Sequence, residues 1–104
     1  MHKTLGPGFL ESIYRKSLLI ELRKRNLLIE NEKEVTIYYE KNDVGCHRLD
    51  ILVQGQIIVE LKTVESLSHA HYAQVRSYLK ATQLKLAILV NFNNEKADFR
   101  RIEA

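Results

Sequence analysis

Residues 48–62 have the sequence RLDILVQGQIIVELK, in which two runs of alternating character flank a polar segment with one glycine. Every second residue gives each run a more apolar face: Leu49, Ile51 and Val53 in the first run, and Ile57, Val59 and Leu61 in the second. Such alternation is typical of strands that place one face against a core. The stretch therefore predicts an antiparallel pair of strands whose apolar faces lie against the same core.

The length of the connecting loop decides which residues of the two strands face each other. A two-residue turn would place Ile51 opposite Glu60 and would break the match of the apolar faces. A three-residue loop over 54–56 preserves the match and is therefore expected. The resulting pairs are Val53 with Ile57, Ile51 with Val59, Asp50 with Glu60, and Arg48 with Lys62.

The pairing of Asp50 with Glu60 needs an explanation, because two carboxylates that face each other across a ladder repel. Lys62 and Arg48 are one source of offsetting charge, and a divalent cation is another. Two carboxylates, with waters completing the coordination shell, suit Mg²⁺ or Mn²⁺. The pattern alone leaves both an exposed charge network and a metal site open.

The sequence around this pair predicts the order α-β-β-β-α-β with a further short strand at the end. The expected elements are a helix over 9–26, strands over 35–39, 48–53 and 57–62, a helix from Ser66 or Ser68 to Thr82, a strand over 84–90 and a short strand over 99–102. The run over 84–90 is almost unbroken apolar sequence, which suits a strand buried on both faces. Helices packed on a sheet in this order give an α/β or α+β fold.

Each predicted helix has a polar residue within its apolar stripe. At about 100° per residue, Glu11 lies between Tyr14 and Leu22. It is either a first-turn acid that the helix dipole favours or a residue that serves a site. Gln74 lies near the centre of the second stripe and is either a structural hydrogen-bonding group or a site residue. That second stripe is Leu67, Ala70, His71, Gln74, Tyr78 and Ala81.

Two motifs resemble those of a known family. Asp50, the short loop and Glu60-Leu61-Lys62 resemble the D…(D/E)-x-K signature of the PD-(D/E)XK nuclease superfamily. Residues 8–14, GFLESIY, resemble the G-x-x-E-x-x-Y motif that names the GxxExxY protein family, a branch of that superfamily. Gln74 and Asn91-Phe92 support the resemblance. It implies a restriction-endonuclease-like αβββαβ core, with a mixed central sheet flanked by helices.

The resemblance also implies a role for each site residue. Mg²⁺ or Mn²⁺ would be held by Asp50, Glu60, the Leu61 carbonyl and Glu11. Lys62 would orient the attacking water or stabilise charge on the phosphate, and Gln74 would hold the substrate backbone or a water on the metal. Asp50 and Glu60 would also take part in catalysis through the metal. Further contacts with the substrate are expected from Arg48, Tyr14, His71 and Tyr78.

These roles imply a metal-dependent nuclease that acts on DNA or RNA. Two other classes remain open at this stage: a catalytically quiet nuclease-like module that binds nucleic acid or protein, and a structural dimer. Cys46-His47 and His69-x-His71 do not have the spacing of a standard zinc site. The charge of +3 and the pI of about 9.1 permit a nucleic-acid partner without requiring one.

Length and composition bound the remaining expectations. The 104 residues predict a single nuclease-like domain over 1–104, and a homodimer is compatible with this size. The resemblance implies more helix upstream of residues 5–8, so part of the family's N-terminal helix is expected to be missing. A single cysteine, Cys46, favours a reducing cytoplasm. No run approaches the about 18 apolar residues of a membrane helix, so no membrane partner is expected.

Overall fold

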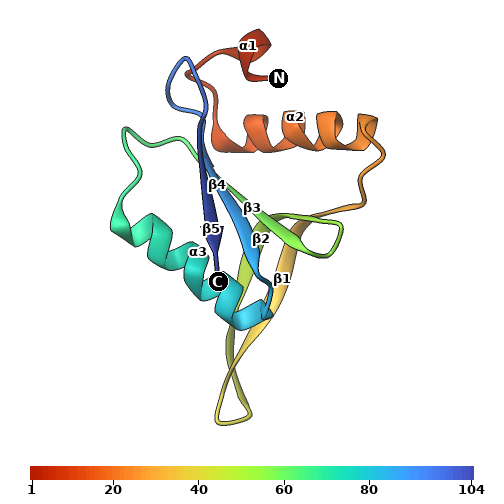
Figure 1. The fold of residues 1–104 in the computed structure, drawn as a ribbon, viewed down its shortest axis with the longest axis vertical. Coiled ribbons are helices and arrows are strands. Elements are labelled where there is room, and N and C mark those ends of the chain that lie inside the picture. Colours follow the sequence, from red (N-terminus) through yellow and green to blue (C-terminus); the bar gives the residue numbers. More distant parts are fainter.

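A five-stranded mixed sheet in the order β1-β2-β3-β4-β5 forms the centre of the fold (Figure 1). The computed structural model describes all residues 1–104. Its elements are α1 His2–Leu5, α2 Glu11–Lys24, β1 Ile29–Tyr39, β2 Asn42–Val53, β3 Ile57–Lys62, α3 His69–Thr82, β4 Leu86–Asn91 and β5 Asp98–Glu103. Strands β3 and β4 run parallel, and the other neighbouring pairs are antiparallel. The predicted α+β fold with helices flanking a mixed sheet is confirmed.

The register predicted for β2 and β3 is confirmed along most of the pair. Val53 pairs with Ile57 and Ile51 with Val59, on either side of the expected three-residue loop. The ladder ends there, however, so Asp50 and Glu60 do not form a further backbone pair. The predicted pairing of Arg48 with Lys62 is wrong, because the ladder between β2 and β3 stops at Ile51; Arg48 pairs only with Glu34 on β1. The two strands therefore part where the candidate site residues begin.

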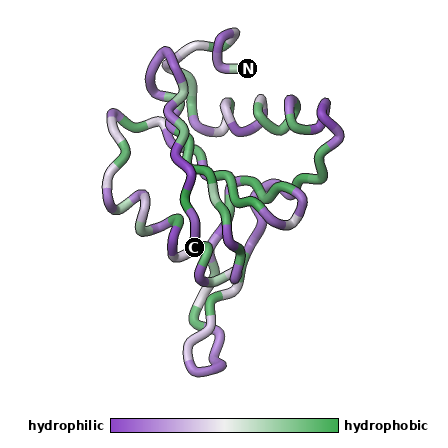
Figure 2. Tube along the Cα trace, viewed as in Figure 1, coloured by the Kyte–Doolittle hydropathy of each residue, from purple (hydrophilic) through white to green (hydrophobic).

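Strands β1 and β2 are much longer than the alternation predicted. They form a hairpin arm that extends beyond the helices at the bottom of Figure 1, with a polar tip in Figure 2. Much of the arm is exposed on both faces, so its residues need no apolar alternation to form a ladder. The short helix α1 was not predicted either. These additions extend the expected core without changing its order.

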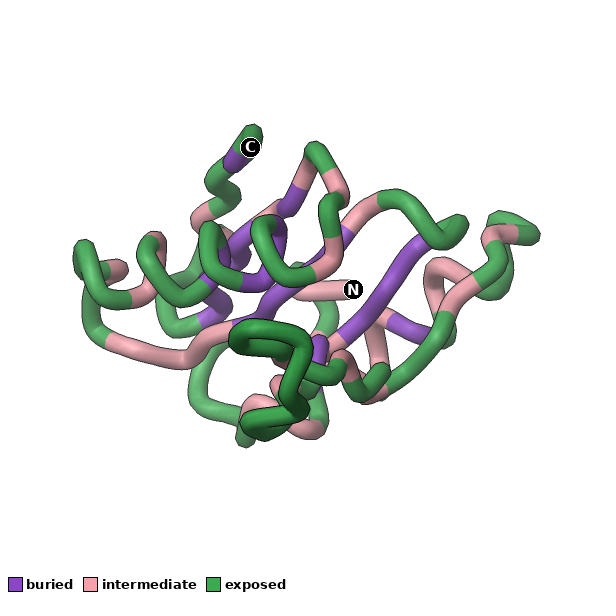
Figure 3. The backbone as a smooth tube through the Cα atoms, turned by 90° about the horizontal axis from the view of Figure 1, so that it is seen from below, coloured by how far each residue is buried: buried purple, intermediate pink, exposed green.

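Each face of the sheet has its own core. The α3 face packs Leu52, Ile58, Val75, Leu79 and Leu89 with neighbouring residues, whereas the α2 face packs Tyr14, Ile51, Val59, Leu61 and Phe92 with theirs. The alternation of β3 explains this division, since Ile58 and Val59 point to opposite faces. Buried residues lie mostly on the strands in Figure 3. The sheet therefore supplies the rigid base from which the site residues project.

The packing of Leu49 differs from the sequence prediction. Leu49 packs with the α3 face rather than with Ile51 on the α2 face. The β1–β2 pairing is interrupted between them, where Glu32 on β1 has φ of 52° and Asp50 has no ladder partner. Such a distortion re-aims side chains between the two faces of a sheet.

The apolar face of α3 is also displaced from the predicted stripe. Val75, Tyr78 and Leu79 are its buried residues, whereas Gln74 is exposed. Ala70 and Ala81 are not buried either, so Tyr78 is the only residue of the predicted stripe that is buried. Gln74 is consequently free to face the region beside β3.

Candidate active site

Asp50 and Glu60 bind each other's strand at the point where the β2–β3 ladder ends. The Asp50 amide donates to Glu60 Oε1 at 2.9 Å, and the Leu61 amide donates to Asp50 Oδ2 at 2.8 Å. Glu60 is only 3% exposed. Each carboxyl thus takes the place of a ladder acceptor for the facing strand and uses one of its two oxygens for a main-chain amide. The two strands part around a pair of neighbouring acids.

In the absence of a cation, burial disfavours the ionised form of Glu60. Desolvation and the nearby charge of Asp50 raise the pKa of Glu60 to about 8, while the Asp50 amide and Lys62 oppose the shift. A hydrogen bond between the two side chains favours the protonated form further. Glu60 therefore carries a proton at neutral pH in the metal-free protein.

Glu11 approaches this pair from the first turn of α2. It is partly buried, and its pKa is raised by that burial and by the charge of Asp50, against the lowering effect of Lys62 and Arg15. The helix dipole also favours an acid at this position. No three His, Cys, Asp or Glu side chains in the chain lie close enough together to hold a metal ion as they stand. Glu11 is thus a neighbour of the pair and not part of a preformed trio.

Lys62 and Gln74 meet beside the two acids. Lys62 Nζ donates to Gln74 Oε1 at 3.2 Å, which joins the end of β3 to α3. The charge of Lys62 lies close enough to Glu60 and Glu11 to oppose the raising of both pKa values by burial. The structure therefore brings Asp50, Glu60, Lys62 and Gln74 together, as the sequence motifs predicted, with Glu11 at their margin.

Tyr78 forms the α3 wall of this region. It is 6% exposed, and burial, with the charges of Glu60 and Asp50, raises its pKa to about 12. Its ring lies 4.8 Å from the ring of His47 on β2, in an edge-on arrangement. Tyr78 therefore stays protonated and is close to the acids, but its buried ring leaves little surface for a substrate.

The other residues expected to contact a substrate have partners within the fold. Arg48 lies 3.7 Å from Glu34, and its charge is not among the causes that shift the pKa of Glu60. His71 Nδ1 accepts a hydrogen bond from the Ser68 amide at 3.0 Å and so caps the start of α3. Neither residue is joined to the two acids by any hydrogen bond or ion pair.

The Tyr14 hydroxyl fixes the loop before α2 by hydrogen bonds to its main chain. It is fully buried, stacks on Phe92 with ring centroids 4.9 Å apart, and donates its hydroxyl proton to the Gly6 carbonyl. The same hydroxyl accepts from the Phe9 amide at 3.2 Å. With no exposed surface, Tyr14 has no direct access to a substrate. Instead it fixes the segment that leads into Glu11.

Replacing Tyr14 by phenylalanine should lower the free energy of unfolding by about 1–3 kcal/mol, because the Gly6 carbonyl and the Phe9 amide lose a shared partner. Urea unfolding followed by circular dichroism measures this change. Tyr39→Phe is the control, since Tyr39 is 67% exposed and should tolerate the substitution. Equal stability of the two variants would contradict the pinning role of Tyr14.

Two structural residues escaped the sequence prediction of the site. Asn91 is 1% exposed, and its side chain donates to the Val64 carbonyl at 2.8 Å and accepts from the Val64 amide at 3.1 Å. It thereby holds the loop that follows Lys62. Arg15 lies 3.0 Å from Glu32 and ties α2 to β1. The polar Asn91 at the end of an apolar run was the available signal, whereas nothing in the sequence indicated the Arg15–Glu32 pair.

No helix of the chain combines the length and the apolar character needed to cross a membrane.

Comparison with known proteins yields a family and a fold. The sequence model of the PD-(D/E)XK nuclease superfamily matches residues 1–102. A solved structure titled "Crystal structure of SSO0001" is similar over 88% of this chain, with a TM-score of 0.69 and 24% sequence identity. This chain covers 48% of that chain, so it spans about half its length. No curated protein matches the sequence. The likeness agrees with the restriction-endonuclease-like fold expected from the motifs.

Proposed function

The chain belongs to the PD-(D/E)XK nuclease superfamily, and from this premise we propose that it is a metal-dependent nuclease that hydrolyses phosphodiester bonds of DNA or RNA. The observation that carries the proposal is the pair of acids at the end of the β2–β3 ladder. Asp50 and Glu60 each hold one main-chain amide there, and Lys62 lies beside them. A structural role alone would not favour two neighbouring acids of which one is buried and the other partly buried.

The donor set fits a divalent cation such as Mg²⁺ or Mn²⁺. Asp50 and Glu60 each have an oxygen not used by a main-chain amide, and hard cations prefer such oxygen ligands. We propose that the Leu61 carbonyl and Glu11, the latter directly or through water, are the remaining protein ligands of the cation. Burial and Asp50 hold a proton on Glu60, and a dication would favour the charged form that both acids need as ligands.

The chain's own residues would divide the work as follows. When bound, a divalent ion neutralises charge on the phosphate and lowers the pKa of a water. Lys62 contributes a mobile positive charge next to that position, where it stabilises negative charge that develops on the scissile phosphate. Gln74 holds the Lys62 amine at 3.2 Å and so limits where that charge can lie. The groups needed for hydrolysis therefore converge from β2, β3 and α3.

The finer placement in the GxxExxY branch rests on three positions. Gly8 has φ of 101°, a conformation that favours glycine, and opens the loop that Tyr14 pins. Glu11, the motif's acid, begins α2 and approaches Asp50. The motif thus has a physical explanation: the buried Tyr14 and the turn at Gly8 position Glu11 at the start of the helix.

We further propose a cytoplasmic setting and nucleic acid as the partner. The single cysteine, Cys46, is free and exposed, which suits a reducing compartment. We also propose a homodimer, which exposed apolar side chains such as Ile20 and Phe99 support.

One observation favours a second candidate, a catalytically quiet module that binds nucleic acid or protein. No three side chains of the usual metal-ligating types are gathered in the chain. A relative that had lost catalysis would still fold around the same sheet and could retain a binding surface. Cleavage assays on single- and double-stranded DNA and RNA, each with Mn²⁺, Mg²⁺ or EDTA, separate the two functions. Cutting that stops in EDTA supports the nuclease, whereas binding without cutting supports the quiet module.

Asp50→Asn should weaken Mn²⁺ binding by about 10-fold or more, and above about pH 8, where Glu60 is ionised, it should raise metal-free stability by about 1 kcal/mol, because it removes one of two repelling charges. The variant should still fold, since the amide oxygen of the new side chain can accept from the Leu61 amide. Calorimetric titration and thermal unfolding in EDTA measure the two effects. Asp43→Asn in the exposed hairpin is the control. A clear loss of metal-free stability would indicate a structural charge network instead.

A further inference from the structure

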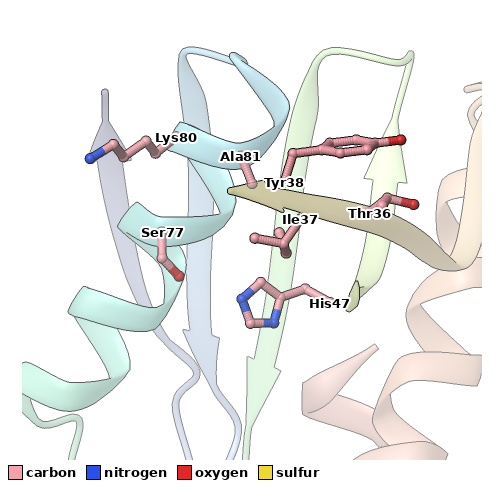
Figure 4. Close-up of a pocket in the computed structure, with 7 residues that line it drawn as sticks. All are labelled: Thr36, Ile37, Tyr38, His47, Ser77, Lys80 and Ala81. Atoms are coloured by element: carbon pink, nitrogen blue, oxygen red, sulfur yellow. The ribbon is translucent and has the colours of Figure 1, made fainter. Parts of the chain in front are cut away.

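A groove of about 430 Å³ separates the second half of α3 from the hairpin arm formed by β1 and β2. Its lining residues are Thr36, Ile37, Tyr38, His47, Ser77, Lys80 and Ala81. In Figure 4, Ile37 and His47 point from the strands toward α3, and Ala81 faces them from the helix. Tyr38 and the Lys80 amine lie at opposite rims and point away from the groove.

The groove lies beside the candidate active site, with Tyr78 between them. The His47 ring lies 4.8 Å from the ring of Tyr78, the residue that also borders Glu60 and Asp50. On α3, Ser77 lies about one helical turn beyond Gln74, the residue that contacts Lys62, and the Ser77 hydroxyl donates to the Gln74 carbonyl at 2.6 Å. Lys80 follows Gln74 after six residues, about 9 Å along the helix axis. A nucleic-acid strand bound at the acids would therefore reach the groove by following the surface of α3.

The chemistry of the lining suits a flat, weakly polar group beside a negative charge. Ile37 and Ala81 provide apolar walls, and the His47 imidazole offers a ring for stacking. No carboxylate lines the groove, and Lys80 at its rim forms no ion pair within the chain. A nucleobase with its phosphate outside satisfies both features, because bases stack on aromatic side chains while phosphates attract lysine.

We propose that this groove holds a base of an unpaired nucleic-acid strand whose backbone continues to Asp50 and Glu60, an inference that rests on the proposed nuclease function. A base inside a duplex has both faces covered by its neighbours and cannot enter a cleft between a helix and a hairpin without being extruded. The preferred substrate is therefore single-stranded, or has an unpaired segment next to the bond that is cut. Single-stranded DNA and RNA share this chemistry, and the test includes both.

The test fills the groove from the helix. Ala81→Phe places a ring between α3 and Ile37, away from the acids, whereas Ala73→Phe adds the same ring at an exposed position of α3 that does not line the groove. Fluorescence anisotropy in EDTA measures binding of labelled oligothymidylate, oligouridylate and a duplex of equal length. Ala81→Phe should weaken binding of both single strands by about 10-fold or more, with less than about a two-fold effect on the duplex. Ala73→Phe should change neither.

Lys80→Ala provides a second test, of the proposed phosphate contact, without adding bulk to the groove. It should lower the slope of log affinity against log salt by about 0.7 for the single strands, as expected for one lost phosphate contact. Lys85→Ala, which lies beyond the end of the helix and outside the groove, should leave the slope unchanged. Circular dichroism confirms that each variant is folded. An unchanged single-strand affinity of folded Ala81→Phe protein, or an equal loss for duplex and single strand, would overturn the groove assignment.

The same variants separate this inference from the proposed function. Groove-dependent binding without metal-dependent cleavage would retain the groove and reject the nuclease. Cleavage that requires metal and cuts single strands equally well in wild type and Ala81→Phe would retain the nuclease and reject the groove.

Discussion

Replacing Lys62 by alanine should lower the rate of metal-dependent phosphodiester cleavage by about 10²–10³-fold while metal affinity stays within about two-fold of the wild type. The loss has the size expected when one positioned charge or donor is removed from a transition state that gains negative charge. Metal affinity is expected to survive because Lys62 forms its hydrogen bond with Gln74 and not with either acid. Initial rates of oligonucleotide cleavage in Mn²⁺ and a calorimetric titration measure the two quantities.

Two further variants make this expectation specific. Gln74→Ala frees the Lys62 amine without removing its charge, so it should reduce the rate less than Lys62→Ala does, by about 10-fold. Lys85→Ala removes a cation from beyond the other end of α3 and should have no effect. If Lys62→Ala cuts as fast as the wild type, Lys62 has no part in the mechanism. If it also abolishes Mn²⁺ binding, the lysine acts through the site's structure instead.

The strand pair at the centre of the site could be predicted because two physical rules acted together. Alternation fixed which residues share a face, and the loop length then left one register, which Ile51 and Val59 confirm. The identities of Asp50, Glu60 and Lys62 came from the family resemblance. Their meeting with Gln74 on α3 was an expectation that the structure realises. Local pattern and motif thus sufficed where the backbone is regular.

The rest could not be predicted because it depends on irregular backbone or on distant partners. Leu49 changes face because of the interruption at Glu32, whose left-handed conformation has no glycine to signal it. Gln74 looked like part of an apolar stripe, yet α3 is rotated so that Val75 and Leu79 are buried instead. Arg48 lies near Glu34 only because β1 extends farther than its apolar residues indicated. Each error concerns tertiary context rather than propensity.

The metal-free protein should lose stability as the pH rises from about 5 to 9, by an amount on the order of a few kcal/mol. Burial and Asp50 raise the pKa of Glu60 from 4.5 to about 8 in the folded state, so the folded protein binds a proton that the unfolded chain releases. The stabilisation is complete below about pH 4.5 and is lost as the pH passes through about 8. Urea unfolding in EDTA at a series of pH values measures this trend.

Glu60→Gln should remove most of that pH dependence, because the glutamine stays neutral and its amide oxygen can still accept from the Asp50 amide. The variant should therefore be more stable than the wild type above about pH 8 and similar to it near pH 5. Glu103→Gln, which replaces an exposed acid on β5, should keep the wild-type profile. Stability of the wild type that rises between about pH 5 and 8 would show that Glu60 is not held protonated by the fold.

Metal binding should oppose the loss of stability at rising pH, because the acid pair that destabilises the metal-free fold is also the proposed metal site. A divalent ion binds the ionised acids, so its entry must displace the proton that burial and Asp50 hold on Glu60. The stabilisation by Mn²⁺ is therefore expected to grow with each pH step from about 6 to 8.5 and to be absent in Glu60→Gln. Thermal unfolding at fixed Mn²⁺ concentration tests this. A pH-independent shift would mean that the ion binds elsewhere, whereas a growing one would show that the fold maintains an unfavourable pair of acids that a cation relieves.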